Sequence, residues 1–206
     1  MRRFPLIFLA GVVFLTACDN VKKPTDRNFR KAINRYFEIH GKTCASIGRE
    51  FPVDVSRATQ KDQYGIEAQM TALEQVGLVH SFDIVVAAPG ILGSSAQRLV
   101  KRYEVTDEGK KYFQEIPGIF GKTGSFCYGE KTVDSIVKWT EPMAMGSYSQ
   151  TEVTYTYKIV DLAPWAERPD IQRLFGDIMT TVSGVSKTSQ LAGLRLTNQG
   201  WEVPAK

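Results

Sequence analysis

The side chains that could do chemistry in this 206-residue chain are few and scattered. His40 lies on an apolar helix face and His80 at the start of a predicted strand, and both positions favour a structural role. The sequence contains no His-Glu-x-x-His, Gly-x-Ser-x-Gly or Ser-x-x-Lys motif and no phosphate-binding loop. We therefore predict no catalytic residue, no metal site and no cofactor.

One segment leaves an enzymatic alternative open. Asp161 and Asp170 flank the sequence Pro-Trp-Ala-Glu-Arg-Pro, in which Trp165 and Arg168 could form a binding notch. Structural packing is the better explanation of the same residues, and nothing in the sequence fixes a substrate. A hydrolase that uses Asp161, Trp165 and Asp170 is therefore the alternative to a binding protein.

The N-terminus has the layout of an export signal. Arg2 and Arg3 supply positive charge, and the stretch from Phe4 to Ala17 is apolar apart from Thr16. This apolar run is too short to span a bilayer comfortably. It ends in Leu15-Thr16-Ala17-Cys18, which resembles the lipobox of bacterial lipoproteins.

That resemblance implies cleavage before Cys18, a diacylglyceryl group on its sulfur and an acyl chain such as palmitate on its new amino group. Acyl chains contribute roughly 0.8 kcal/mol per buried methylene, so several chains on one residue make a durable anchor. Asp19 resembles the inner-membrane retention signal of enteric-type lipoproteins, which implies the periplasmic face of the inner membrane rather than the outer membrane. An ordinary secretory signal and an uncleaved anchor are the alternatives.

Export also bears on charge and on the remaining cysteines. Removing residues 1–17 takes away two arginines and no acidic residue, so the formal net charge falls from +4 to a value too small for a nucleic-acid partner.

Cys44 and Cys127 remain in a compartment that oxidises thiols, and we predict a disulfide between them. A nucleophilic or metal-binding cysteine is the alternative. The polar tether, residues 19–25, reaches at most ~25 Å and keeps the folded part near the membrane.

The first half of the chain shows helical periodicity followed by strands. A helix capped by Thr25 or Asp26 carries an apolar face and ends at Gly41. A second helix stops at Gly77. The predicted elements are a helix over 26–40, an irregular stretch over 42–56, a helix over 62–76, strands over 78–86 and 99–105, and a short helix over 107–113.

Residues 62–113 resemble the back half of winged-helix domains. A leucine-bearing helix ends in Gly77-Leu78-Val79, a two-stranded wing follows, and Val105-Thr106-Asp107-Glu108-Gly109 resembles the closing Leu-Thr-x-x-Gly. In that family the helix before the wing reads DNA. Here the helix has no basic residue after Lys61, which predicts poor phosphate contacts. DNA binding is an alternative only if the chain is not exported.

The second half is predicted to be β-rich. Residues 118–130 are rich in glycine and are predicted to be a linker. Strands over 132–140 and 152–162 alternate in polarity and form an antiparallel hairpin. A helix begins at Pro169. An apolar-Thr-x-x-Gly pattern near the C-terminus matches the one around Thr106, so the halves could be distant helix-and-hairpin repeats.

Three loops carry pairs of large apolar residues where loops are usually polar. As exposed tips these pairs would suit a partner surface, and methionine adapts to varied contacts. Folded back, they would be lids on the core. The pairs are Ile91 and Leu92, Ile119 and Phe120, and Met143 and Met145.

Together these observations favour an α+β, non-catalytic, lipid-anchored periplasmic protein that binds an envelope protein or neutralises a toxin. An envelope hydrolase is the alternative. The predicted segments are a signal peptide over 1–17, a lipidated tether over 18–25, a winged-helix-like domain over 26–117 and a β-rich domain over 118–206, which could pack as one unit.

Overall fold

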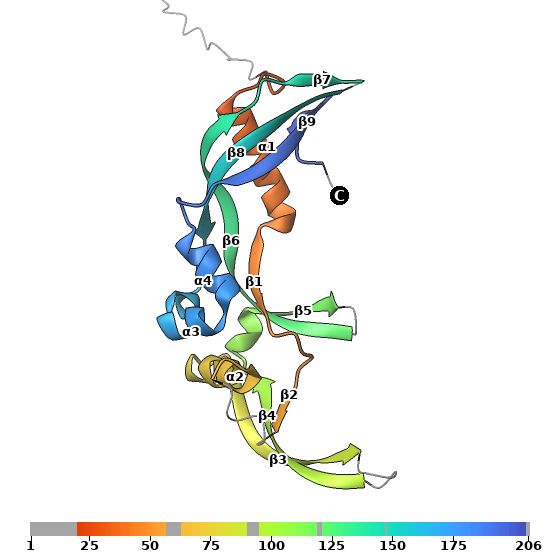
Figure 1. The fold of residues 1–206 in the computed structure, drawn as a ribbon, viewed down its shortest axis with the longest axis vertical. Coiled ribbons are helices and arrows are strands. Elements are labelled where there is room, and N and C mark those ends of the chain that lie inside the picture. The colour runs from red at the N-terminus through yellow and green to blue at the C-terminus, as the bar shows by residue number, and fades with distance from the viewer. Residues whose placement is uncertain (1–19, 57–62, 90–94, 119–120, 147, 205–206) are drawn as a thin grey trace, which may run out of the picture.

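The computed structural model shows an elongated α+β fold built on antiparallel sheets (Figure 1). It describes residues 20–56, 63–89, 95–118, 121–146 and 148–204. The helices are α1 (Asp26–His40), α2 (Ile66–Gln75), η3 (Gly109–Lys111), η4 (Pro164–Glu167), α3 (Pro169–Leu174) and α4 (Gly176–Ser183). The strands are β1 (Lys42–Ser46), β2 (Val53–Ser56), β3 (Val79–Pro89), β4 (Ser95–Val105), β5 (Phe113–Gly118), β6 (Gly121–Trp139), β7 (Met143–Met145), β8 (Tyr148–Val160), β9 (Gln190–Thr197) and β10 (Gly200–Glu202).

Within the described residues the strands form two sheets. The larger, of seven strands, has the order β1-β6-β8-β9-β10, with β5 paired to β6 and β7 paired to β8. The 19-residue β6 pairs with β1, β5 and β8 and is the spine of this sheet. The smaller sheet has the order β2-β4-β3 and lies at the opposite end of the long axis from β7 (Figure 1).

Helix α1 covers one face of the large sheet, as its apolar periodicity predicts. Thr25 caps the helix, because its Oγ1 accepts a hydrogen bond from the Asn28 amide at 3.3 Å. Phe29, Ile33 and Phe37 are buried against a cluster that includes Val133, Val153, Tyr155, Leu194 and Trp201. The helix therefore joins strands that are distant in the sequence.

A second core joins the two halves that the sequence analysis separated. Met70 and Tyr103 from the first half pack in one cluster with Phe126 and Trp165 from the second. The predicted boundary after residue 117 falls inside the β5–β6 hairpin, whose register pairs Pro117 with Lys122. The described halves thus share both a sheet and a core.

The predicted helix, hairpin and capped turn occur in that order between residues 66 and 111. Helix α2 gives way to Gly77, which has a φ of 76°, a conformation that favours glycine. β3 and β4 then pair over eleven residues each. Thr106 Oγ1 donates to the Gly77 carbonyl at 2.6 Å and accepts from the Gly109 amide at 2.9 Å, which closes the turn into η3.

Two predictions about irregular segments were wrong. Residues 42–46 form β1 and pair with β6, and residues 121–130, predicted to be a linker, begin β6. Gly124 reflects close packing rather than flexibility. A Cβ on Gly124 would lie 2.6 Å from Phe51 Cδ2 and 2.8 Å from Phe113 Cε2.

The predicted disulfide between Cys44 and Cys127 is confirmed. The two residues are register partners on the neighbouring strands β1 and β6, next to a register shift after Thr43. Gln114 Nε2 donates a hydrogen bond to Cys44 Sγ at 3.2 Å. Since the cysteines are 83 residues apart in sequence, the bond closes a loop that contains α2 and the whole small sheet.

Candidate binding surface

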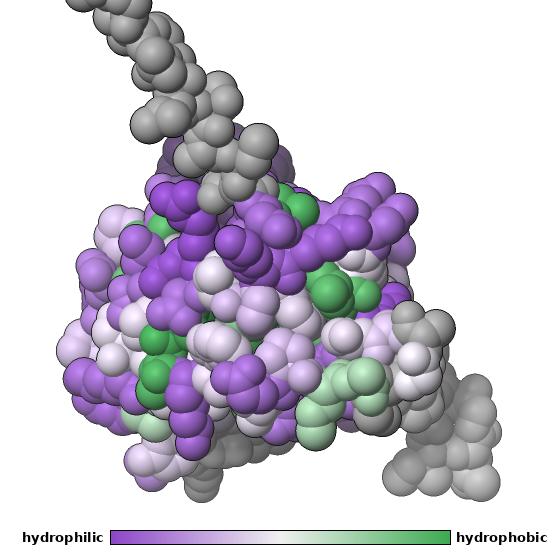
Figure 2. Space-filling model, turned by 90° about the horizontal axis from the view of Figure 1, so that it is seen from above, coloured by the Kyte–Doolittle hydropathy of each residue, from purple (hydrophilic) through white to green (hydrophobic). Residues whose placement is uncertain are grey.

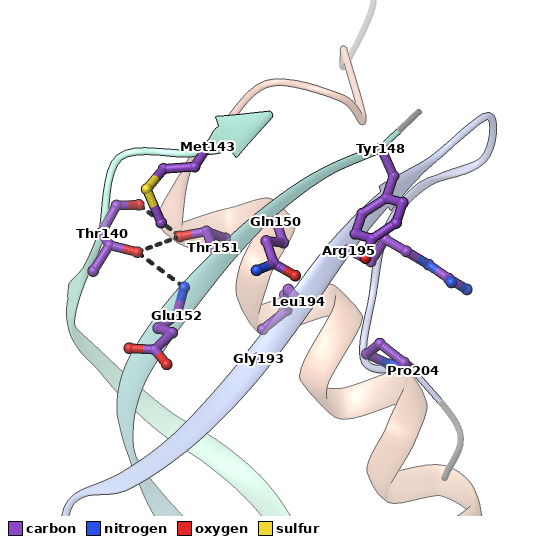
Figure 3. A pocket seen from close by; sticks show the side chains of 10 residues that line it. All are labelled: Thr140, Met143, Tyr148, Gln150, Thr151, Glu152, Gly193, Leu194, Arg195 and Pro204. Atoms are coloured by element: carbon purple, nitrogen blue, oxygen red, sulfur yellow. Dashed lines mark hydrogen bonds between the residues drawn. The ribbon is translucent and has the colours of Figure 1, made fainter. Parts of the chain in front are cut away.

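A groove of about 450 Å³ opens on the face of the large sheet that α1 does not cover (Figure 3). Side chains alternate along a strand, and Val153 and Leu194 point toward α1. Gln150 and Arg195 are register partners on the other face, as are Glu152 and Gly193. Because Gly193 has no side chain, the sheet surface is hollowed at that pair.

The base of the hairpin at the groove is held by paired threonines. Thr151 Oγ1 donates to the Thr140 carbonyl at 2.6 Å, and Thr140 Oγ1 accepts from the Glu152 amide at 3.0 Å. Met143, on the rim above them, is 61% exposed. Thus the backbone under Met143 is fixed while its side chain is available for contact (Figure 3).

The other side of the groove combines an aromatic ring with a cation. Arg195 Cζ lies 5.8 Å from the centre of the Tyr148 ring, within the range of a cation–π contact. Its Nη2 also lies 3.0 Å from Glu202 Oε1, so strand β10 helps to orient the guanidinium. Tyr148 remains 41% exposed.

The residues of the groove are of the types that bind proteins. Tyrosine, methionine and arginine are enriched at protein–protein interfaces, and here they surround the polar side chains of Gln150 and Glu152. The described lining contains neither histidine nor cysteine. Nowhere in the described ranges do three or more His, Cys, Asp or Glu side chains converge as a metal site would require.

The comparisons with known proteins do not decide the identity. No family model, curated protein or solved structure matches this chain. The described helices include none that is long and apolar enough to cross a membrane.

Residues 143–145, predicted to lie at the tip of a hairpin loop, instead form strand β7. Ile91, Leu92, Ile119 and Phe120 lie outside the described residues, whereas Met143 is exposed and Met145 pairs with Tyr148 on β8. The hairpin arms β3–β4, β5–β6 and β7–β8 all extend toward the same side of the molecule (Figure 1). The groove lies at the base of the third arm.

The residues of the hydrolase alternative have structural roles or separate surroundings in the part of the chain that is described. Trp165 is buried in the core, with its ring 6.0 Å from Tyr112. Asp170 is bound by the Arg168 guanidinium at 2.7 and 3.0 Å, and these hydrogen bonds lower the pKa of Asp170 to about 2. Asp161 lines a separate hollow near Cys127. A carboxylate held ionised by arginine cannot act as a general acid near neutral pH.

The histidines are likewise separate. His40 is exposed at the end of α1, and its ring centre lies 4.4 Å from that of Tyr36. His80 Nε2 lies 3.8 Å from Glu104 Oε2 across the β3–β4 hairpin, and its ring stacks on Phe82. The His40 contact lies within α1, and the His80 contacts lie within the β3–β4 hairpin.

Sequence reasoning missed Tyr148, Gln150, Gly193 and Arg195. The alternation after residue 152 was evident, but the groove depends on the pairing of Gln150 with Arg195 across two strands. The only local sequence signal for the groove is Gly193 within strand β9. A glycine inside a regular strand marks a hollow in the sheet surface or a place that another group approaches closely.

Proposed function

We propose that this chain is a lipid-anchored, non-catalytic periplasmic protein that binds another protein of the cell envelope or neutralises an imported toxin. The observation that carries the proposal is Leu15-Thr16-Ala17-Cys18 at the end of a short apolar run behind two arginines. Cleavage before Cys18 and acylation of that residue would fasten the folded part to the membrane. Asp19 supports retention at the inner membrane.

Binding by the groove is the second part of the proposal. It is supported by an exposed methionine and tyrosine beside an oriented arginine on a sheet face that α1 leaves open. The burial of Trp165 and the pairing of Asp170 with Arg168 favour binding over hydrolysis. The three hairpin arms extend toward one side of the molecule (Figure 1).

A winged-helix relationship for residues 62–113 is also proposed. It is supported by the sequence of α2, the β3–β4 hairpin and the turn closed by Thr106. Helix α2 carries Glu67 and no lysine or arginine, so it is unsuited to DNA phosphates. The proposed repeat has weaker support, because Thr197 is the last residue of β9 and pairs with Gly200 of β10, whereas Thr106 leads into η3.

Site-specific photocrosslinking in intact cells tests the binding proposal. A photoreactive amino acid at Gln150 is expected to yield one dominant adduct in the membrane fraction. The same group at Lys110, which lies on η3 and does not line the groove, is expected to yield no such adduct. Adding Tyr148→Ala should lower the adduct yield about tenfold, as loss of an interface tyrosine commonly does.

Tyr64→Ala is the matched control, because Tyr64 is another exposed tyrosine, on the loop that precedes α2. It should leave the yield unchanged. Equal adducts from positions 150 and 110, or no adduct from either, would contradict binding through the groove.

A further inference from the structure

We infer that the end of the molecule from which the N-terminal segment leaves is a docking face for an anionic bilayer, and that this face holds the molecule with its long axis away from the membrane. The inference rests on the proposed lipidation of Cys18. It adds an orientation and a second membrane contact that the anchor alone does not supply.

Residues 20–23 are held against the folded body by hydrogen bonds. Trp201 Nε1 donates to the Lys22 carbonyl at 3.1 Å, and the Trp201 side chain is only 4% exposed. Asn28 Nδ2 donates to the carbonyls of Asn20 at 3.0 Å and Lys23 at 2.9 Å. Most of the predicted tether is therefore part of the fold, held by both α1 and β10.

Very little chain lies between the proposed anchor, Cys18, and the folded body. One residue, Asp19, separates Cys18 from Asn20. Two Cα–Cα steps span at most ~8 Å, against the ~25 Å that a free tether would allow. The headgroup layer on each side of a bilayer is about 5–8 Å thick. An acylated Cys18 would thus hold this end of the body against the headgroups.

This end of the molecule carries exposed positive charge. Lys22, Lys23, Lys31 and Arg35 are all exposed, and the last two line a shallow hollow together with Val21. Figure 2 shows a largely hydrophilic surface around the point where the chain leaves. Asp26, at the start of α1, accepts a hydrogen bond from Trp139 Nε1 at 3.1 Å. The excess of positive charge matches anionic headgroups, and the polar surface suits contact with the headgroup layer rather than insertion.

The orientation that follows places the groove near the membrane. Tyr148 lines the groove and also a second hollow that contains Lys22 and Ala144. The small sheet lies at the far end of the long axis (Figure 1). A protein bound in the groove would therefore itself be embedded in, or attached to, the membrane.

Lysine footprinting tests the docking face. The chain from Cys18 onward, which retains every described residue, is coupled through that thiol to a maleimide lipid in vesicles. With phosphatidylglycerol in the vesicles, acetylation of Lys22, Lys23 and Lys31 is expected to slow at least fivefold relative to the same coupled chain in pure phosphatidylcholine. Lys101 and Lys110 are internal controls that should not change. Unchanged rates at Lys22 and Lys23 would overturn the inference.

Charge variants of the same chain, without coupled lipid, give a second readout. Replacing Lys22 and Lys23 together by glutamine is expected to lower its partition onto phosphatidylglycerol vesicles about 25-fold, or fivefold per lysine near an anionic surface. Lys110→Gln with Lys111→Gln is the matched control and should leave partition unchanged; equal losses in both pairs would contradict the docking face. Because the lipid is attached chemically, footprinting reads the face whether or not cells acylate Cys18.

Discussion

Replacing Phe29 by alanine is expected to lower the free energy of unfolding by about 4 kcal/mol. The Phe29 ring is fully buried, and it makes edge contacts with Trp139 at 5.3 Å and Trp201 at 5.2 Å. These residues come from α1, β6 and β10, so the cavity would open where the helix and the sheet meet. Urea unfolding followed by circular dichroism measures the loss.

Ile39→Ala on the same helix is the control for Phe29→Ala. Ile39 is 77% exposed, so its removal should change the free energy of unfolding by no more than about 0.5 kcal/mol. If Phe29→Ala cost no more than this control, α1 would not be packed on the sheet in the way described. Removal of the Phe29 ring should also weaken the attachment of residues 20–23, which would be measured as faster amide hydrogen exchange in that segment.

Loss of the disulfide is expected to destabilise the protein by about 4 kcal/mol. The bond joins cysteines 83 residues apart, and closing so long a loop strongly restricts the unfolded chain. The double variant Cys44→Ala with Cys127→Ala should therefore unfold at a markedly lower urea concentration than the wild type. The β1–β6 pairing itself should survive, since its backbone register extends to residues on either side.

Reduction of the wild-type protein supplies the control for that variant. A thiol reductant should lower the stability of the wild type to that of the double variant and should leave the variant unaffected. A wild-type protein whose unfolding is the same with and without reductant, while a thiol count shows that the bond is broken, would contradict the stabilising role.

Elements with local signals could be predicted from the sequence. Thr25, the apolar spacing from Phe29 to Phe37 and Gly41 define α1 almost to the residue. Gly77 and the apolar runs after it define the β3–β4 hairpin, and the alternation from Val153 to Ile159 defines β8. In each case neighbouring residues alone determine the structure.

Elements that depend on distant partners could not be predicted. Glycines before residue 130 indicate a linker by composition, yet Gly124 lies within β6, where its lack of a side chain leaves room for Phe51 and Phe113. Register shifts in β6 turn Val137 outward, where it is 54% exposed, although simple alternation places it with Val133. The groove has the same origin, because Gln150 and Arg195 become neighbours only when β8 and β9 pair.

The most direct test of lipid anchoring compares the wild type with Cys18→Ser in cells supplied with labelled palmitate. The wild type is expected to carry the label on an N-terminal peptide that begins at residue 18, and the variant is expected to carry none and to retain residues 1–17. Cleavage and membrane association that persist unchanged in Cys18→Ser would contradict the anchoring and, with it, the proposed orientation on the membrane.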